Sequence, residues 1–319
     1  MMVLVTDSLC SSALAAGISK IEVPAVDREP ALHAMVWSPC ATASIPVQIG
    51  PLTVQGVCDC AVEGNKLPLV VISHGKGASL LSHHDTASVL TDAGFVVATL
   101  NHPGDFFGDE TSSRQLKIFE TRPHDISRLI SFMTQQWQHR DRLDSNAIGV
   151  FGFSRGGYTA LVLAGATPST LAGAKHLCNH LWSLVDSLCR QFKAEGSQLH
   201  PQADPRIRAA VVVDPLNLFD ARGLQSVHIP VQLWASEQGG DGVKLEHTEE
   251  IRDALPQLSD YHVARGAGHF AYLAPCSPTL KKANPGICID PNGFDRTAWH
   301  LSMNTAVVTF FKQKLLPNP

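Results

Sequence analysis

The chain contains the stretch AIGVFGFSRGGYTALVLA at residues 147–164. Two apolar runs flank a Gly-x-Ser-x-Gly pattern, which predicts a strand, a sharp turn and a helix. A serine at the apex of such a turn needs glycine at 152 and 156, because side chains there would collide with the strand and the helix. The Ser154 hydroxyl is then exposed above the sheet edge, where helix N–H groups also point. The stretch therefore predicts a nucleophilic serine at 154. An ordinary glycine-rich turn is the simpler alternative, and the residues described below argue against it.

Strand and helix patterns alternate along the rest of the chain. Several strand candidates are continuous β-branched runs, as central parallel strands require. The strand candidates are Ala31–Trp37, Leu67–Ser73, Phe95–Leu100, Ala147–Phe151, Ala209–Val213, Val231–Ala235 and Tyr261–Ala264. The helix candidates are Leu81–Asp92, His124–Gln138, Tyr158–Gly165, Leu245–Ala254 and Thr297–Lys314. This alternation predicts a doubly wound α/β fold with a mainly parallel sheet and helices on both faces.

The composition is that of an ordinary globular chain. The 319 residues are 44% hydrophobic and 17% charged, so one large α/β domain over 1–319 can bury a sizeable core. The net charge is −4, with basic residues scattered, which argues against a nucleic-acid partner. No apolar run approaches the length of a membrane span.

Residues 168–204 interrupt the alternation. Within them, apolar residues from Leu171 to Phe192 recur at spacings of three and four, which predicts one apolar helical face. A surface helix packed on the core is one interpretation. We favour a helical cap insertion over the site, with Trp182 near the substrate.

The N-terminus and the cysteines both favour a location outside the cytoplasm. Residues 1–17 end in small residues, as a signal cleavage region does, although they lack a basic start. Of the eight cysteines, Cys276 and Cys288 flank a loop that a disulfide would clip, and Cys40 has Cys58 or Cys60 as a partner. No second Cys pair completes a zinc site, so we expect no metal. We expect a periplasmic or secreted protein, with one cysteine unpaired if a leader is removed, and a cytoplasmic protein is the alternative.

A serine hydroxyl needs a base within hydrogen-bond reach, and histidine is the usual one. His269 stands out among fifteen histidines, since it lies in GAGHF just past the last strand candidate. Two aspartates lie between Ser154 and His269 at strand ends, as the order serine, acid, histidine requires. Asp214 directly follows a very apolar strand, which would hold its side chain more rigidly than a loop would, so we favour it as the acid. Asp241 follows the next strand in a Gly-rich loop, and stays as the alternative acid.

The oxyanion that forms during acyl transfer needs two fixed donors. We expect one to be the backbone N–H of Arg155 and the other that of Lys76, in the loop after the strand that ends at Ser73. The glycines of His-Gly-Lys-Gly let this loop approach the substrate. The spacing matches neither nucleotide-binding glycine motif. Residues expected to line the substrate site are His74, Gly75, Trp182, Leu216, Leu218, Phe219 and Phe270.

These motifs resemble those of the α/β-hydrolase superfamily. Within it, the chain is most similar to bacterial dienelactone hydrolase-like esterases related to platelet-activating-factor acetylhydrolase. The matching stretches are LVVISHG at 69–75, GFSRGG at 152–157 and GHF at 268–270. The resemblance implies an α/β-hydrolase fold and a serine esterase that uses Ser154, His269 and an aspartate. The acetylhydrolase and the chlorophyllases place the acid after the earlier strand, which matches Asp214, whereas other bacterial relatives would place it at Asp241.

Two departures limit what the resemblance implies. True dienelactone hydrolases use a cysteine nucleophile, so dienelactone chemistry is not expected with Ser154. The insertion at 168–204 is absent from the acetylhydrolase pattern, so a phospholipid substrate does not follow. We expect a cofactor-free carboxylic-ester hydrolase that acts on small-molecule short- or medium-chain or aromatic esters. An amidase or peptidase on the same residues, and a non-catalytic binding protein on this scaffold, are the alternatives.

Overall fold

The computed structural model describes residues 15–50, 52–178 and 186–316. Residues 1–14, most of the stretch interpreted as a leader, lie outside this part of the chain, and Ala15–Gly17 begin strand β1. The described strands form one ten-stranded sheet in the order β10-β9-β8-β7-β5-β6-β2-β1-β4-β3. They are β1 (Ala15–Val23), β2 (Leu32–Cys40), β3 (Ile45–Ile49), β4 (Leu52–Cys58), β5 (Leu67–Ser73), β6 (Val96–Leu100), β7 (Leu143–Phe153), β8 (Ile207–Val213), β9 (Val231–Ser236) and β10 (Leu258–Ala264).

The six strands from β5 to β10 pair in parallel, while β2 is antiparallel to both β6 and β1. Every residue of β5 and β6 is buried, as the continuous apolar runs of their sequences predict. Because parallel strands end at one edge, Ser73, Phe153, Val213 and Ser236 all finish at the same edge of the sheet. The residues that follow these strand ends are therefore neighbours.

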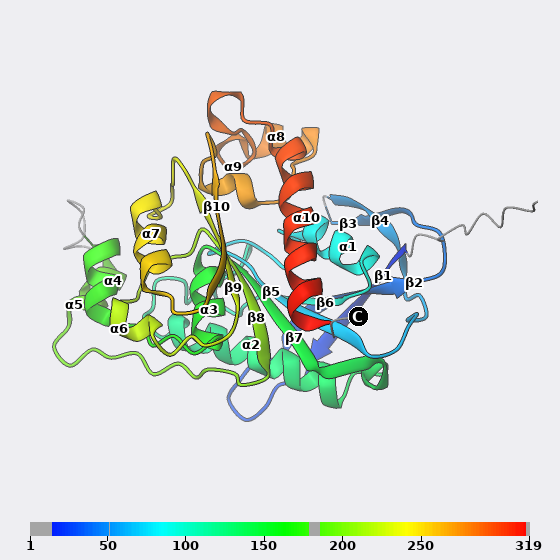
Figure 1. The fold of residues 1–319 in the computed structure, drawn as a ribbon, viewed down its shortest axis with the longest axis horizontal. Helices are drawn as coiled ribbons and strands as arrows, with labels where there is room; N and C mark the ends of the chain where they lie inside the picture. The colour runs from blue at the N-terminus through cyan, green and yellow to red at the C-terminus, as the bar shows by residue number, and fades with distance from the viewer. Residues whose placement is uncertain (1–14, 51, 179–185, 317–319) are drawn as a thin grey trace, which may run out of the picture.

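Helices cover both faces of the sheet (Figure 1). The longer helices are α1 (His84–Asp92), α2 (Ile118–Gln135), α3 (Arg155–Leu163), α4 (Thr170–Leu177), α5 (Ser187–Lys193), α7 (Leu245–Ala254) and α10 (Arg296–Leu315). Short helices are α6 (Ala221–Leu224), α8 (Pro278–Ala283) and α9 (Pro285–Cys288). Helices α2, α3 and α7 pack in one hydrophobic core, and α1 and α10 pack in a second core on the opposite face. The expected α/β fold, with helices on both faces of a mainly parallel sheet, is confirmed.

All seven predicted strands are present, and β5 has the predicted bounds. Three strands were not predicted. Strand β1 pairs with β2 along nine residues, and β3 and β4 form a hairpin at the sheet edge. No residue of β3 is buried, and the buried residues of β4 alternate with exposed ones. Neither strand therefore has the continuous apolar run that marks the central strands.

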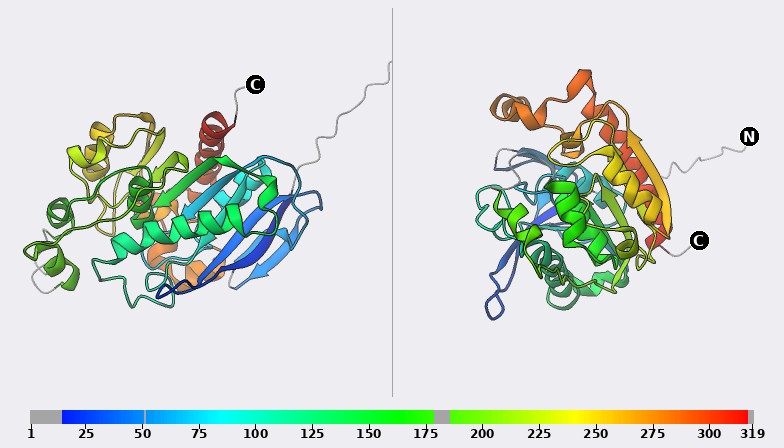
Figure 2. Two further views of the ribbon diagram at one scale, coloured as in Figure 1. Left: turned by 90° about the horizontal axis from the view of Figure 1, so that it is seen from below. Right: turned by 90° about the vertical axis from the view of Figure 1, so that its left-hand side faces the viewer.

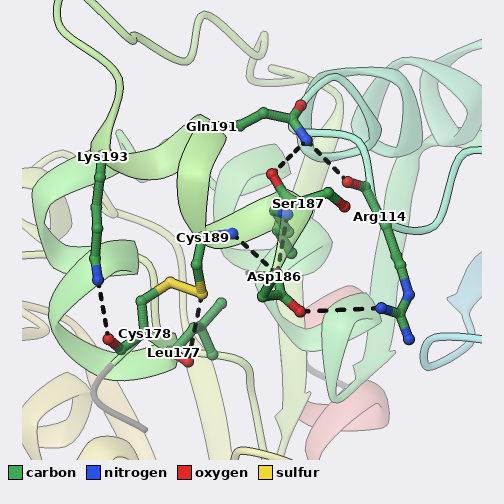
Figure 3. The surroundings of a disulfide bond; sticks show 9 residues. Arg114, Leu177, Cys178, Asp186, Ser187, Cys189, Gln191 and Lys193 are labelled. Carbon is green, nitrogen blue, oxygen red and sulfur yellow. Dashed lines mark hydrogen bonds and ion pairs between the residues drawn. A yellow bond between two sulfur atoms is a disulfide. The ribbon is translucent and has the colours of Figure 1, made fainter. Parts of the chain in front are cut away.

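Residues 168–204 contain two helices, α4 and α5, among their described positions, rather than one continuous face. Asp186 caps the N-terminus of helix α5, and its carboxylate accepts hydrogen bonds from the N–H groups of Leu188 and Cys189. Figure 3 shows how a disulfide between Cys178 and Cys189 links the two helices. The Gln191 side chain joins α5 to residues 114–116 of the main body. Helix α4 lies beside α7, since Lys175 pairs with Glu250.

Three disulfides are formed within the described residues: Cys40–Cys60, Cys178–Cys189 and Cys276–Cys288. The expected clip between Cys276 and Cys288 is confirmed, and Cys60 rather than Cys58 is the partner of Cys40. Within the described residues Cys58 is the free cysteine, and it is exposed. Disulfides persist in oxidising surroundings, so these three indicate an oxidising compartment. In the described part of the chain, no helix has both the length and the apolar character to cross a membrane.

Candidate active site

Ser154 lies in a strained turn between β7 and α3. Its φ angle is +58°, a backbone conformation that residues with a side chain rarely adopt. A side chain would not fit at either glycine of the motif. A Cβ on Gly156 would lie 1.9 Å from the Ser73 carbonyl oxygen, and one on Gly152 would lie 2.0 Å from the Gly156 carbonyl oxygen. The serine therefore sits where β5, β7 and α3 lie in close contact, as the motif predicts.

His269 faces Ser154 from the loop after β10. Its Nε2 atom lies 3.0 Å from the Ser154 Oγ. The His269 N–H donates to the carbonyl of Gly239, at 2.7 Å, and this fixes the backbone of the loop. The ring of Phe153 stacks on the imidazole with 4.7 Å between ring centroids. Both the backbone and the ring of His269 are thus held in place.

Asp214 holds the other side of the imidazole. Its Oδ2 atom lies 2.6 Å from the His269 Nδ1, and the carboxylate is fully buried. The hydroxyl of Ser236 donates to Oδ2 at 2.6 Å, and the Ser236 N–H donates to Oδ1 at 2.8 Å. Because a carboxylate only accepts, the His269 Nδ1 carries the ring proton. The Nε2 atom is then free to accept the proton of Ser154.

Asp241, the alternative acid, occupies a different position. It is exposed, and among the described residues no hydrogen bond joins it to His269. The Gly-rich loop that carries it contributes backbone instead, since Gly239 accepts the His269 N–H and a Cβ on Gly240 would lie 3.1 Å from the His269 Cβ. The geometry therefore brings Asp214, and not Asp241, to the histidine.

The loop after β5 lies directly beside the serine. A Cβ on Gly75 would lie 3.4 Å from the Ser154 Cβ and 3.1 Å from the Phe153 ring. His74 is buried, and its Nδ1 lies 2.6 Å from the Gly75 carbonyl oxygen, while Nε2 accepts the His102 N–H at 3.3 Å. Burial, and then the Arg122 guanidinium, lower the pKa of His74 well below its ordinary value, so this histidine is neutral. Lys76 follows on the surface, with its side chain exposed.

A buried charged cluster lies under this loop. Asp105 is fully buried and pairs with Arg122 at 2.6 Å and with Arg155 at 2.8 Å. His102 lies beside them, with Nε2 3.0 Å from the Ser73 hydroxyl and Nδ1 3.0 Å from the Asp125 carboxylate. Burial, and then Arg122, lower the pKa of His102 well below its ordinary value. Among the described residues no group of acidic, histidine and cysteine side chains has the arrangement of a metal site.

The other described residues expected to line the substrate site lie either beside His269 or in the hydrophobic core. Phe270 is half-buried beside His269, with 5.5 Å between the ring centroids. Leu216, Leu218 and Phe219 are buried in the core that α3 shares, and the Phe219 ring stacks on Tyr158. Trp182 lies outside the described residues.

Three residues that touch the candidate site were not predicted from the sequence. Ser236 is the last residue of β9, and Asp214 directly follows β8. Because neighbouring parallel strands end side by side, these two positions could have indicated that Ser236 lies beside Asp214. Phe153 is the residue before the serine, and its apolar side chain carried no signal of a stack on His269. Arg122 occupies one position of a regular apolar spacing that continues through Ile126 and Leu129, and a charge on such a face indicates a buried ion pair.

Comparison with solved structures finds a similar fold. A ferulic acid esterase from Streptomyces cinnamoneus superposes with a TM-score of 0.67 and 18% sequence identity, over 97% of this chain and 92% of that chain. No protein-family model matches the chain. A search of curated proteins also gives no match. At this identity the likeness establishes the shared fold, and the chemistry has to be argued from the residues.

Proposed function

We propose that this chain is a serine carboxylic-ester hydrolase with the α/β-hydrolase arrangement, in which Ser154, His269 and Asp214 form the catalytic triad. The observation that carries the proposal is the continuous hydrogen-bonded relay from the Ser154 hydroxyl through the imidazole to the buried carboxylate. A relay of this kind turns a weak nucleophile into a reactive one. Its position at the carboxyl edge of the sheet, on a strained strand-to-helix turn, supports the same reading.

The proposed reaction has two halves. The Ser154 Oγ attacks the ester carbonyl carbon while its proton moves to the His269 Nε2, and a tetrahedral oxyanion forms. The backbone N–H groups of Arg155 and Lys76 donate to that oxyanion. The C–O bond to the alcohol breaks, and the alcohol leaves with the proton from His269. A water molecule, deprotonated by His269, then attacks the acyl-enzyme, and the acid is released as Ser154 regains its proton.

Asp214 keeps the imidazole in one tautomer and stabilises its cation after proton transfer. The two hydrogen bonds from Ser236 hold the carboxylate in that orientation. The stack of Phe153 on the imidazole restricts the ring further. These contacts would preorganise the base before the substrate binds.

The substrate class we propose is small esters with short or medium acyl chains or an aromatic group. The half-buried Phe270 beside His269 supports an apolar contact next to the reacting carbonyl. The similar solved structure is named a ferulic acid esterase, which makes an aromatic acyl ester a sensible first test substrate. In the same proposal, residues 168–204 form a helical cap within a single domain, and the protein works in the periplasm or outside the cell.

The test is covalent labelling of the protein with a fluorophosphonate, followed by peptide mapping by mass spectrometry. We expect one adduct on Ser154, none in Ser154→Ala, and labelling slower by about two orders of magnitude or more in His269→Ala and in Asp214→Asn. Asp241→Asn is the matched control and should label at the wild-type rate. An adduct elsewhere, or full esterase activity in Ser154→Ala, would overturn the mechanism. Matched ester and anilide substrates then distinguish an esterase from an amidase.

A further inference from the structure

Asp105 sits between two arginines that reach different parts of the candidate site. Its Oδ2 atom accepts from the Arg122 Nη1 at 2.6 Å and from the Arg155 Nη1 at 2.8 Å. None of the three side chains is more than 5% exposed. One carboxylate oxygen therefore joins helix α2, which carries Arg122, to helix α3, which begins at Arg155.

On one side, the connection runs to the loop after β5. The Arg122 Nη2 donates to the carbonyl oxygen of His74 and lies 3.4 Å from the Ser73 hydroxyl. His74 is two residues before Lys76, whose N–H is one of the two proposed oxyanion donors. Arg122 thus anchors the backbone of that loop from below.

On the other side, the connection runs to the residue after the nucleophile. The Arg155 Nη1 also donates to the Ser113 carbonyl at 3.0 Å, and its guanidinium lies over the Phe119 ring, 5.2 Å from the centroid. The N–H of the same residue is the other proposed donor. Its side chain is therefore fixed by a carboxylate, a carbonyl and an aromatic face.

Stability alone gives a weak reason for such a cluster. When an ion pair is buried, both charges lose their hydration, which costs free energy. Apolar side chains of similar volume often make a protein equally stable. The pattern of contacts is more specific, because the carboxylate joins two separate backbone segments that flank Ser154.

We propose that Asp105 is a positioning residue that sets the spacing between the two oxyanion donors, acting through Arg155 on one and through Arg122 and the His74 carbonyl on the other. The inference rests on the proposed function. Oxyanion stabilisation depends on donors placed for the charge that develops in the transition state, so a small change in their spacing lowers the rate of the chemical step. Asp105, Arg122 and the Arg155 side chain touch no substrate in this account.

The test compares an oxygen ester with the thionoester of the same acid and alcohol. Sulfur in the C=S group is larger and a weaker acceptor, so a well-spaced pair of donors favours the oxygen ester in particular. The variants are Asp105→Asn, Arg122→Lys and Arg155→Lys, each assayed per active site titrated with fluorophosphonate. Arg122→Lys keeps the charge but cannot make both the Nη1 contact to Asp105 and the Nη2 contact to His74. Arg155→Lys keeps the charge but loses the planar guanidinium over the Phe119 ring. Both variants stay informative if Asp105→Asn does not fold.

We expect kcat for the oxygen ester to fall by about 100-fold in each variant, the loss typical of one oxyanion donor. The thionoester should lose much less, so that the ratio of the two rates falls by about 10-fold or more, with KM nearly unchanged. The matched control is Arg206→Lys. Arg206 likewise bridges a carboxylate, that of Asp204, and a carbonyl, that of Ser127, at the opposite end of β8. Its rate ratio should stay at the wild-type value.

Equal losses on the two substrates, or an unchanged kcat per titrated site with only a lower active fraction, would mean a structural role and overturn the inference. Failure of the proposed function has a different signature. It would appear in the wild type itself, as no ester hydrolysis and no adduct on Ser154, and the inference would fall with it.

Discussion

The carboxylate of Asp214 accepts two hydrogen bonds from Ser236, one from the hydroxyl at 2.6 Å and one from the N–H at 2.8 Å. Asp214 follows β8 and Ser236 ends β9, so the two adjacent parallel strands place them side by side. The hydroxyl shares the Oδ2 atom with the His269 Nδ1. Ser236 therefore controls the orientation of the oxygen that the histidine uses.

The first prediction concerns Ser236→Ala. We expect kcat for ester hydrolysis to fall by about 10- to 100-fold, because a charge-assisted hydrogen bond of roughly 1.5–3 kcal/mol that orients the acid is lost. Asp214→Asn should cost about 10⁴-fold, because an amide in place of the carboxylate favours the wrong imidazole tautomer. Steady-state kinetics on an aromatic ester measures both effects. Asp241→Asn is the control, and a loss in Asp241→Asn with none in Asp214→Asn would reverse the assignment of the acid.

The second prediction concerns the close approach of β5 and α3. In Gly156→Ala the new Cβ would lie 1.9 Å from the Ser73 carbonyl oxygen and 2.6 Å from its carbon, both of them backbone atoms that no side-chain rotation can move away. We expect a loss of about 3 kcal/mol or more in the free energy of unfolding, or no soluble protein. Urea denaturation measures it.

Gly286→Ala is the matched control for this substitution. Gly286 lies in the short helix α9, and a Cβ there would meet nothing within 4 Å. Because glycine is a poor helix former, we expect a change within about 1 kcal/mol, towards higher stability. Wild-type stability in Gly156→Ala would show that the two backbones do not lie this close.

The third prediction concerns the stability of the protein as a function of pH. Burial raises the pKa of Asp125 to about 7, although Arg122 acts in the opposite direction. The carboxyl lies 3.0 Å from the His102 Nδ1. In an unfolded chain an aspartate has a pKa of about 3.9, so between about pH 4 and 7 the folded protein holds a proton that the unfolded chain lacks. This group therefore lowers the free energy of unfolding by about 1.4 kcal/mol per pH unit as the pH rises through that window.

Asp125→Asn should remove this contribution. Relative to the wild type, the variant should gain stability from pH 4.5 to pH 7.5, in urea denaturation at several pH values. Titrating groups that do not contact Asp125 are common to both proteins, so their effects cancel in the difference. Asp241→Asn, the same substitution at an exposed position, is the control. A constant difference between Asp125→Asn and the wild type would contradict the raised pKa.

The sequence predicts the central fold well because its signals are local. Continuous apolar runs mark the parallel strands, and the glycines at 152 and 156 mark the turn that carries Ser154. The start of helix α2 is a feature that local signals do not predict. Its predicted start is His124, after Pro123, yet the helix begins at Ile118. The Phe119 carbonyl, four residues before Pro123, accepts the Tyr158 hydroxyl at 2.9 Å in place of the N–H that proline lacks.

The sequence favours Asp214 as the acid but leaves Asp241 as an alternative, for a related reason. Both follow strands that end at one edge, and each precedes His269 by a plausible distance. The outcome depends on which loop turns its side chain and which turns its backbone towards the histidine. That is a property of three segments packed together, and no local pattern reports it. The same holds for Asp105, whose two arginine partners come from positions 122 and 155.

The fourth prediction concerns the disulfide between Cys178 and Cys189. It joins α4 to α5 across a sequence separation of 11, and Figure 2 shows the two helices at the outer end of the molecule. Closing a loop of this length removes conformational entropy from the unfolded chain worth about 3 kcal/mol. The double substitution to alanine should lower the free energy of unfolding by about that amount if α5 unfolds together with the sheet.

The contacts of Gln191 with residues 114–116 are the reason to expect this cooperative loss, since they attach α5 to the main body. Urea denaturation of the double variant measures it, and Cys58→Ala is the control because that exposed cysteine is in no disulfide. If the double variant unfolds at the wild-type urea concentration while α5 becomes sensitive to protease, α4 and α5 unfold by themselves. The disulfide then stabilises α4 and α5 locally and contributes nothing to the sheet that carries Ser154.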